Sequence, residues 1–265
     1  MTRLLFPPEF FHALAGLARR RSRPGGGNAA TPRAGRGLLG FEHRAYAPGD
    51  DLRQLDWRAT ARAGAAQLRL REEERGGSLR LVLDRSPSMA PGGARRDEDL
   101  RRLALALGWL HLEAGGVLRL VAGGGPEQTF VGYERRAALQ EVLEGLEPPL
   151  GGPGVEGMLR GGPCVWLTDP WCEPPPVFPG DATVVTLVLP EEDDPATGGL
   201  RLKDAESAEE LEVELDAADW SRRWDGWLER RQRRLRAAGA RALVLRCGAG
   251  GATALLQRAE EAGLV

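Results

Sequence analysis

The stretch LRLVLDRSPSMA, Leu79 to Ala90, begins as an apolar run and ends abruptly in small polar side chains. An apolar run of this length, bounded by a polar turn, predicts a buried strand. Asp84, Ser86 and Ser88 then stand at alternate positions in the loop at the carboxyl end of that strand. In an open α/β sheet, ligands bind at this edge, so the loop is the first candidate for a functional site.

The chemistry of the loop suits a hard cation. One carboxylate and two hydroxyls are oxygen ligands of the kind that Mg²⁺ prefers. Asp and Ser also cap helices, so Asp84 and the two serines alternatively only stabilise the start of a following helix. The spacing by itself leaves both hypotheses open.

The composition is that of an ordinary soluble globular protein. The chain has 265 residues, of which 42% are hydrophobic and 28% charged, and this length suffices for one large α/β domain or two smaller ones. The formal net charge of −2 argues against a general polyanion binder. We therefore expect no nucleic-acid partner.

The cysteines and the apolar runs bear on the cellular location. The three cysteines, Cys164, Cys172 and Cys247, form no CxxC pair, which is typical of a reducing compartment and does not favour a zinc site. No apolar run approaches the ~20 residues of a membrane span. The N-terminus has no signal-peptide core. We expect a cytoplasmic protein with no membrane span.

Strands and helices alternate from Leu79 onward. Leucines at helical spacing predict helices around 100–110 and 139–146, and Gly123 to Gly125 predict an antiparallel hairpin. Strands separated by helices favour a mostly parallel sheet covered on both faces, a doubly wound, Rossmann-like α/β fold. The expected strands cover residues 79–83, 117–122, 128–133, 164–168, 182–189, 211–215 at an edge, and 242–245.

Three further helices are expected near the ends of the chain, the last of them over residues 252–262. Residues 9–20 place Phe10, Leu14 and Leu17 on one side of a helix, and a Gly/Pro/Arg-rich flexible linker follows to Gly37. A long helix from Trp220 to about Ala238 should bury its tryptophan side. Its other side should face water and carries Arg222, Arg223, Arg230, Arg233, Arg234 and Arg236.

We divide the chain into three parts. Residues 1–37 form an N-terminal arm, residues 38–77 a segment that packs on the main domain, and residues 78–265 the main domain. Within the second part, Tyr46 and Trp57 should pack against the sheet.

The Asp-x-Ser-x-Ser loop resembles the metal-ion-dependent adhesion site of von Willebrand factor A domains. Asp84, Ser86 and Ser88 match the first loop of that family, and Asp169, which ends the strand CVWLT, matches its third loop. The resemblance implies a sheet of von Willebrand factor A type and a Mg²⁺ site formed by these four residues. The family has a Thr in its second loop where this chain has Pro153, which implies weak or partner-dependent binding. Arg85 is an alternative source of positive charge for Asp84.

A second resemblance covers the segment from Arg44 to Arg62. The pattern Arg44-Ala-Tyr46-Ala-Pro48-Gly-Asp50-Asp51, with Asp56-Trp57 and Ala61-Arg62 after it, resembles the signature of the domain of unknown function 58 family. Members often stand beside MoxR-family AAA+ ATPases. The resemblance implies a partner of such an ATPase in chaperone-like maturation of client proteins.

The expected function is a non-enzymatic protein-interaction module that binds through this adhesion-type metal site. The alternative is a Mg²⁺-dependent hydrolase or phosphotransferase on the same fold, which needs a general base near the metal. No His lies in either loop, so we assign no catalytic residue and no organic cofactor.

Overall fold

The computed structural model describes residues 4–21, 43–45, 60, 67–69, 77–91, 95–147, 163–178, 181–205, 207–248 and 250–265. Several predictions concern residues outside these ranges. They are the linker from Ser22 to Gly37, the packing of Tyr46 and Trp57, and the place of Pro153.

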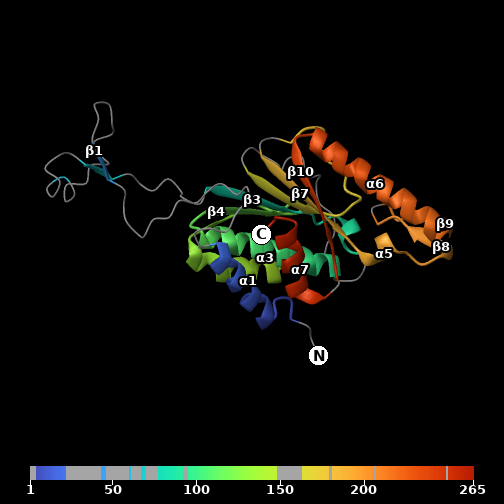
Figure 1. Ribbon diagram of the computed structural model, residues 1–265, viewed down its shortest axis with the longest axis horizontal. Coiled ribbons are helices and arrows are strands. Elements are labelled where there is room, and N and C mark those ends of the chain that lie inside the picture. The colour runs from blue at the N-terminus through green and yellow to red at the C-terminus, as the bar shows by residue number, and fades with distance from the viewer. Residues whose placement is uncertain are drawn as a thin grey trace.

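A six-stranded sheet forms the centre of the molecule (Figure 1). Its strand order is β10-β7-β6-β3-β4-β5, and every neighbouring pair is parallel except β4 with β5. The predicted mostly parallel, Rossmann-like α/β sheet and its single antiparallel hairpin are confirmed. The strands are β3 (Ser78–Leu83), β4 (Val117–Ala122), β5 (Gln128–Val131), β6 (Cys164–Thr168), β7 (Ala182–Val188) and β10 (Ala240–Arg246).

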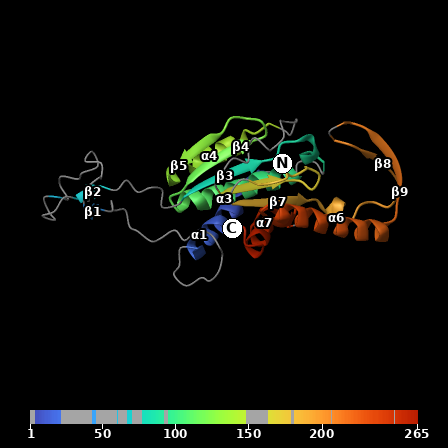
Figure 2. The ribbon, with the colours of Figure 1, turned by 90° about the horizontal axis from the view of Figure 1, so that it is seen from above.

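Helices lie on both faces of this sheet, as Figure 1 and Figure 2 show together. Alternate residues of a strand point to opposite faces, so Leu81 and Leu83 belong to one core cluster and Val82 to another. The first cluster includes residues of α1, α3, α4 and α7, and the second is closed by Leu235 of α6. The helices are α1 (Pro8–Arg21), α3 (Arg95–Glu113), α4 (Arg136–Glu144), α5 (Pro190–Asp193), α6 (Ala217–Ala237) and α7 (Gly251–Glu261).

The first helix belongs to the main core. Phe10, Leu14 and Leu17 are buried on one side of α1, as expected, and they lie in the same cluster as the leucines of α3 and α7. This helix is the first part of the expected N-terminal arm. Its apolar side needs a partner surface, and α3 and α7 provide one.

The expected edge strand at 211–215 does not join the main sheet. It is part of β9 (Glu210–Leu215), which pairs with β8 (Gly198–Lys203) in a separate antiparallel pair. A second small pair consists of β1 (His43–Ala45) and β2 (Gln67–Arg69). None of the helices in the described ranges combines the length and the apolar character that crossing a membrane requires.

Candidate cation site at the carboxyl edge of the sheet

The register of two central strands brings the predicted site residues together. Strands β3 and β6 are parallel neighbours with Leu83 paired to Leu167, and the backbone N–H of Asp84 donates to the carbonyl of Leu167 at 2.9 Å. Asp84 and Asp169 therefore follow the carboxyl ends of their strands at the same edge of the sheet. Both side chains are buried, with residue exposures of 4% and 0%.

The loop after β3 uses the Asp84 carboxylate to hold its own shape. Oδ1 accepts the backbone N–H of Ser86 at 2.9 Å, and Oδ2 accepts the hydroxyl of Thr168 at 2.6 Å. The hydroxyls of Ser86 and Ser88 lie 2.9 Å apart. Ser86 precedes the short 3-10 turn η2 (Pro87–Met89) and makes no side-chain capping bond. The capping hypothesis thus accounts for part of the role of Asp84 but not for the Ser86 hydroxyl.

Asp169 has one carboxylate oxygen that is satisfied and one that is not. Oδ1 accepts the backbone N–H groups of Trp171 at 2.7 Å and Cys172 at 2.9 Å. Oδ2 is buried and accepts no hydrogen bond, and the nearby Arg96 Nη1 is 3.8 Å away. Burial, and then repulsion by Asp84, raise the pKa of Asp169, while Ser88 and Arg96 offset part of that shift.

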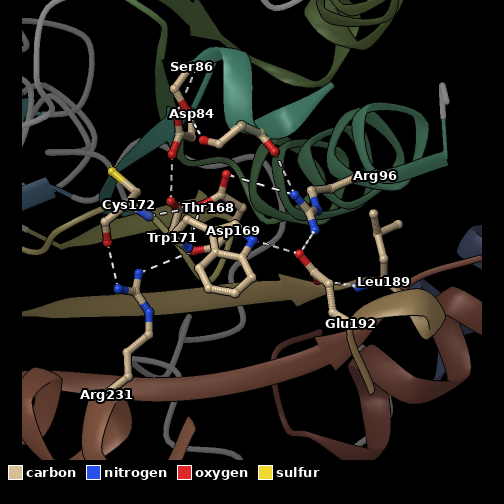
Figure 3. A network of polar contacts seen from close by, with 11 residues as sticks. Asp84, Ser86, Arg96, Thr168, Asp169, Trp171, Cys172, Leu189, Glu192 and Arg231 are labelled. Carbon is tan, nitrogen blue, oxygen red and sulfur yellow. Dashed lines mark hydrogen bonds and ion pairs between the residues drawn. The ribbon is translucent and has the colours of Figure 1, made fainter. Parts of the chain in front are cut away.

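Arg96 is the buried positive charge of the site (Figure 3). It comes from the first turn of α3, its exposure is 0%, and it donates to the carbonyl of Ser88 at 2.7 Å. Its other terminal nitrogen pairs with Glu192 of α5. The same Glu192 oxygen accepts the indole N–H of Trp171 at 2.8 Å. Arg96 therefore connects both site loops to α5.

A second arginine holds the loop after β6 from the other face of the sheet. Arg231 of α6 donates to the carbonyls of Cys172 at 2.5 Å and Asp169 at 3.2 Å (Figure 3). Arg231 and Arg96 thus place two positive charges near the buried carboxylate of Asp169.

Neither arginine is among the predicted site residues, although each had a signal in the sequence. Arg96 stands four residues before Leu100 and Arg231 three residues after Leu228, so both lie on the apolar stripe of their helices. Arg85, the alternative source of positive charge for Asp84, pairs with Asp97 and donates to the carbonyl of Glu147, and its interaction with Asp84 is the smallest of those that act on it.

The arrangement suits a weakly held hard cation better than nucleophilic chemistry. The side-chain donors of Asp84, Ser86, Ser88 and Asp169 are all oxygens, and one buried oxygen among them accepts no hydrogen bond. Within the described ranges, no group of three His, Cys, Asp or Glu side chains could hold a metal. Burial, with repulsion by Asp84 and Asp169, raises the pKa of the neighbouring Cys172 thiol to about 12. That thiol stays protonated near neutral pH and is a poor nucleophile.

Comparison with known proteins confirms one of the two resemblances over part of the chain. Residues 42–151 match the model of a family described as "Protein of unknown function DUF58". The uncharacterized proteins Rv1480 of Mycobacterium tuberculosis and Mb1516 of Mycobacterium bovis are each 28% identical over 234 residues. Each alignment covers 77% of this chain and 73% of the relative.

Two solved structures are similar at lower identity. They are the conserved hypothetical protein BatB of Bacteroides thetaiotaomicron, at 13% identity and a TM-score of 0.38, and an aerotolerance-related membrane protein of Bacteroides fragilis, at 14% and 0.40. Each comparison covers 71% of this chain and 99% of the other.

Proposed function

We propose that this protein is a binding module that captures a carboxylate of a partner protein through a divalent cation at the carboxyl edge of its sheet. Asp84, Ser86, Ser88 and Asp169 would hold the cation. When bound, the cation supplies a positive charge with an open coordination position, which a partner carboxylate can fill. The role of the chain is to orient the four oxygen ligands and to keep the site rigid.

The observation that carries this proposal is the state of Asp169 Oδ2. A carboxylate oxygen that is buried without a hydrogen bond, beside a second carboxylate, is costly unless a positive charge or the protonation of one acid compensates for it. Arg96 compensates only in part, because its Nη1 lies 3.8 Å away and its Nη2 pairs with Glu192. A cation that shares Asp169 with Ser86 and Ser88 would supply the missing partner of Oδ2 and offset the repulsion between Asp84 and Asp169.

The identity of the partner rests on sequence resemblance. We propose that the partner is a MoxR-family AAA+ ATPase and that this ATPase and the present protein act together in the maturation of client proteins. We also propose that the sheet is of von Willebrand factor A type. The match of residues 42–151 to the unknown-function family supports the resemblance from which this partner was inferred. The cation site is expected to be weak by itself and tight only in the complex, where the partner adds a ligand.

Three features support a non-enzymatic role. His111, the histidine at the end of α3, contacts the first residue of β4 and so lies at the opposite edge of the sheet. The carboxylates of Asp97 and Glu192 are engaged in ion pairs with arginines. The Cys172 thiol is protonated near neutral pH. A hydrolase would need a base that these groups do not supply.

Calorimetry with Mg²⁺ and Mn²⁺ tests the proposal, first on the isolated chain and then on its mixture with the candidate ATPase. We expect weak cation binding alone and clearly tighter binding in the mixture. Asp84→Asn should abolish both, because it removes the charge but keeps an oxygen that can accept the Thr168 hydroxyl. Asp84→Ala is a poorer test, because it leaves that buried hydroxyl without an acceptor.

The matched control is Asp181→Asn, which removes an exposed carboxylate just before β7, at the amino edge of the sheet. It should leave cation and partner binding unchanged. Partner binding that survives both EDTA and Asp84→Asn would rule out the cation bridge.

A further inference from the structure

A second surface of the molecule combines aromatic and positively charged side chains. Trp220, Trp224 and Trp227 of α6 and Trp171 of the loop after β6 line a groove together with arginines of α6. Trp224 stacks nearly parallel to Trp220 and Trp227, at interplanar angles of 14° and 3°. Trp171 packs against Trp224 and Trp227 with ring centroids 5.4 and 5.3 Å apart.

Only part of this aromatic cluster is core. Trp224 is 3% exposed, as expected for the tryptophan side of the helix, but Trp171 is 47% exposed, and Trp220 and Trp227 are half-buried. A cluster of exposed aromatic side chains in a groove indicates a binding surface more often than a structural role.

The rings of the groove are held rigidly by the acidic segment around α5. The indole N–H of Trp220 donates to the carbonyl of Glu192 at 2.8 Å, and that of Trp224 donates to Asp193 Oδ1 at 3.0 Å. Trp171 donates to Glu192 as well. These bonds use the polar ends of the rings, so the groove presents hydrocarbon edges in a fixed arrangement. A preorganised surface loses little entropy on binding.

The rim of the groove carries a surplus of positive charge. Arg222, Arg223 and Arg230 line it, and Asp219 is the one carboxylate among its lining residues in the described part of the chain. Arg222 and Arg223 share Asp219, at 3.4 and 2.7 Å. Among the described residues, Arg230 has no ion-pair partner, and it is exposed. The rim therefore suits a ligand with carboxylates.

We propose that this tryptophan groove docks an acidic segment of a partner protein, which lays a proline or other apolar side chain against the ring edges and pairs its carboxylates with the arginines. The proposal goes beyond the cation site and needs no metal. Seven residues of helix separate Trp220 from Trp227, or about 10 Å along the axis. An extended chain covers that length with about three residues, so the segment is short.

A protein segment fits the groove better than a nucleic acid. Single-stranded nucleic acids bind by stacking bases on open aromatic faces. Here the faces of Trp224 are engaged by Trp220 and Trp227, and the formal net charge of the chain is −2. Ring edges beside guanidinium groups instead suit an apolar side chain flanked by carboxylates.

Titration of the full chain in EDTA tests the groove separately from the cation site. The probes are three octapeptides that carry two glutamates at each end and differ in their central residues, which are proline, leucine or phenylalanine. Three matching octapeptides carry lysines in place of the glutamates. Binding is followed by the tryptophan fluorescence of the protein and by calorimetry. We expect at least one glutamate peptide to bind, its lysine counterpart to bind at least tenfold more weakly, and affinity to fall as salt rises.

Two charge reversals on α6 locate the binding surface. Arg230→Glu should weaken binding at least tenfold, because Arg230 lies three residues from Trp227, on the same side of the helix. Arg236→Glu is the matched control: it lies nine residues from Trp227, half a turn away, is exposed, and should leave affinity unchanged. Trp227→Ala should also abolish the fluorescence response.

The proposal is overturned if none of the glutamate peptides binds, or if Arg230→Glu and Arg236→Glu have the same effect. It is equally overturned if a twelve-residue oligothymidylate binds through Arg230 while the peptides do not. Because EDTA is present throughout, failure of the cation bridge does not change these outcomes.

Discussion

The fully buried guanidinium of Arg96 connects the two loops at the carboxyl edge of the sheet. Arg96 has 0% exposure, and its charge faces Asp169 and Glu192, while its hydrogen bond to the carbonyl of Ser88 holds the serine loop. A buried charge is tolerated only with such partners, and removing one member leaves the others uncompensated. Arg96 is thus a structural support for the site and not one of its ligands.

We expect Arg96→Met to lower the free energy of unfolding by about 3–5 kcal/mol, because it removes the ion-pair partner of the buried Asp169 and the partly buried Glu192. Urea unfolding measures this difference. The neighbouring Arg95→Met is the control: its partner Glu191 is 56% exposed, so the loss should stay within about 1 kcal/mol. Equal losses in the two variants would contradict the role assigned to Arg96.

His111 gives the protein a predictable pH dependence. Its Nε2 lies 3.2 Å from the carbonyl of Val117, and burial lowers its pKa below the ordinary value of 6.5. Below pH 6.5 the unfolded chain therefore binds a proton that the folded chain does not. Folding stability should fall as the pH drops from above 6.5 towards the folded-state pKa.

The measurement is urea unfolding of the wild type and of His111→Gln between pH 5 and pH 8. The wild type should lose more stability than the variant across this range, since Gln keeps a donor for the Val117 carbonyl but does not titrate. Parallel pH profiles would show that His111 does not contribute.

At the scale of elements, α3 is packed so closely that a side chain at one of its positions would have to displace two leucines. A Cβ at Gly108 would lie 2.5 Å from Cδ2 of Leu139 in α4 and 2.7 Å from Cδ2 of Leu118 in β4. The absence of a side chain there allows the helix to approach both neighbours. Through this close approach, α3 connects α4 with the edge of the sheet that contains β4 and β5.

We expect Gly108→Ala to destabilise the protein by about 1–3 kcal/mol, because overpacking outweighs the gain in helix propensity. Gly16→Ala in α1 is the matched control, because its Cβ would meet nothing closer than an arginine nitrogen at 3.6 Å. That substitution should stabilise the protein by up to about 1 kcal/mol. Thermal melts of the two variants should shift in opposite directions; two upward shifts would contradict the packing argument.

At the scale of the whole molecule, the N-terminal helix and the sheet share one core. Phe10 is 0% exposed and packs in the cluster that contains β3, α3 and α7, while Arg102 of α3 donates to the carbonyl of Leu5 at 2.9 Å. Segments nearly a hundred residues apart thus stabilise each other. We expect α1 and the sheet to unfold in one cooperative transition.

Phe10→Ala should cost about 3–5 kcal/mol of that shared stability, because it leaves a cavity in the core. His12→Ala, on the exposed side of the same helix, should cost no more than about 0.5 kcal/mol. Calorimetric unfolding of both variants provides the comparison. A separate low-temperature transition in Phe10→Ala, with the main transition unchanged, would mean that α1 folds independently of the sheet.

Local patterns were enough to predict the main sheet, and a family resemblance added the candidate site. Apolar runs and leucines at helical spacing depend only on neighbouring residues, and they located the strands of the main sheet and α3, α4 and α6. Asp84 and Asp169 each end an apolar strand, and the resemblance to von Willebrand factor A domains implied that these two strands are neighbours, so the two carboxylates could be paired in advance. The exposed arginine side of α6 followed from the same periodicity.

Tertiary structure alone decided which charged groups are buried and which tryptophans are exposed. Arg96 lies 96 residues from its partner Glu192, and Trp171 lies 53 residues from Trp224, so no local window contains either pair. Whether β9 joins the edge of the main sheet or pairs with β8 was likewise decided only in the folded molecule, where it pairs with β8. The physical reason is the same in each case. The free energy of burying a charge or an aromatic ring depends on the groups that surround it, and the fold brings those groups from distant parts of the chain.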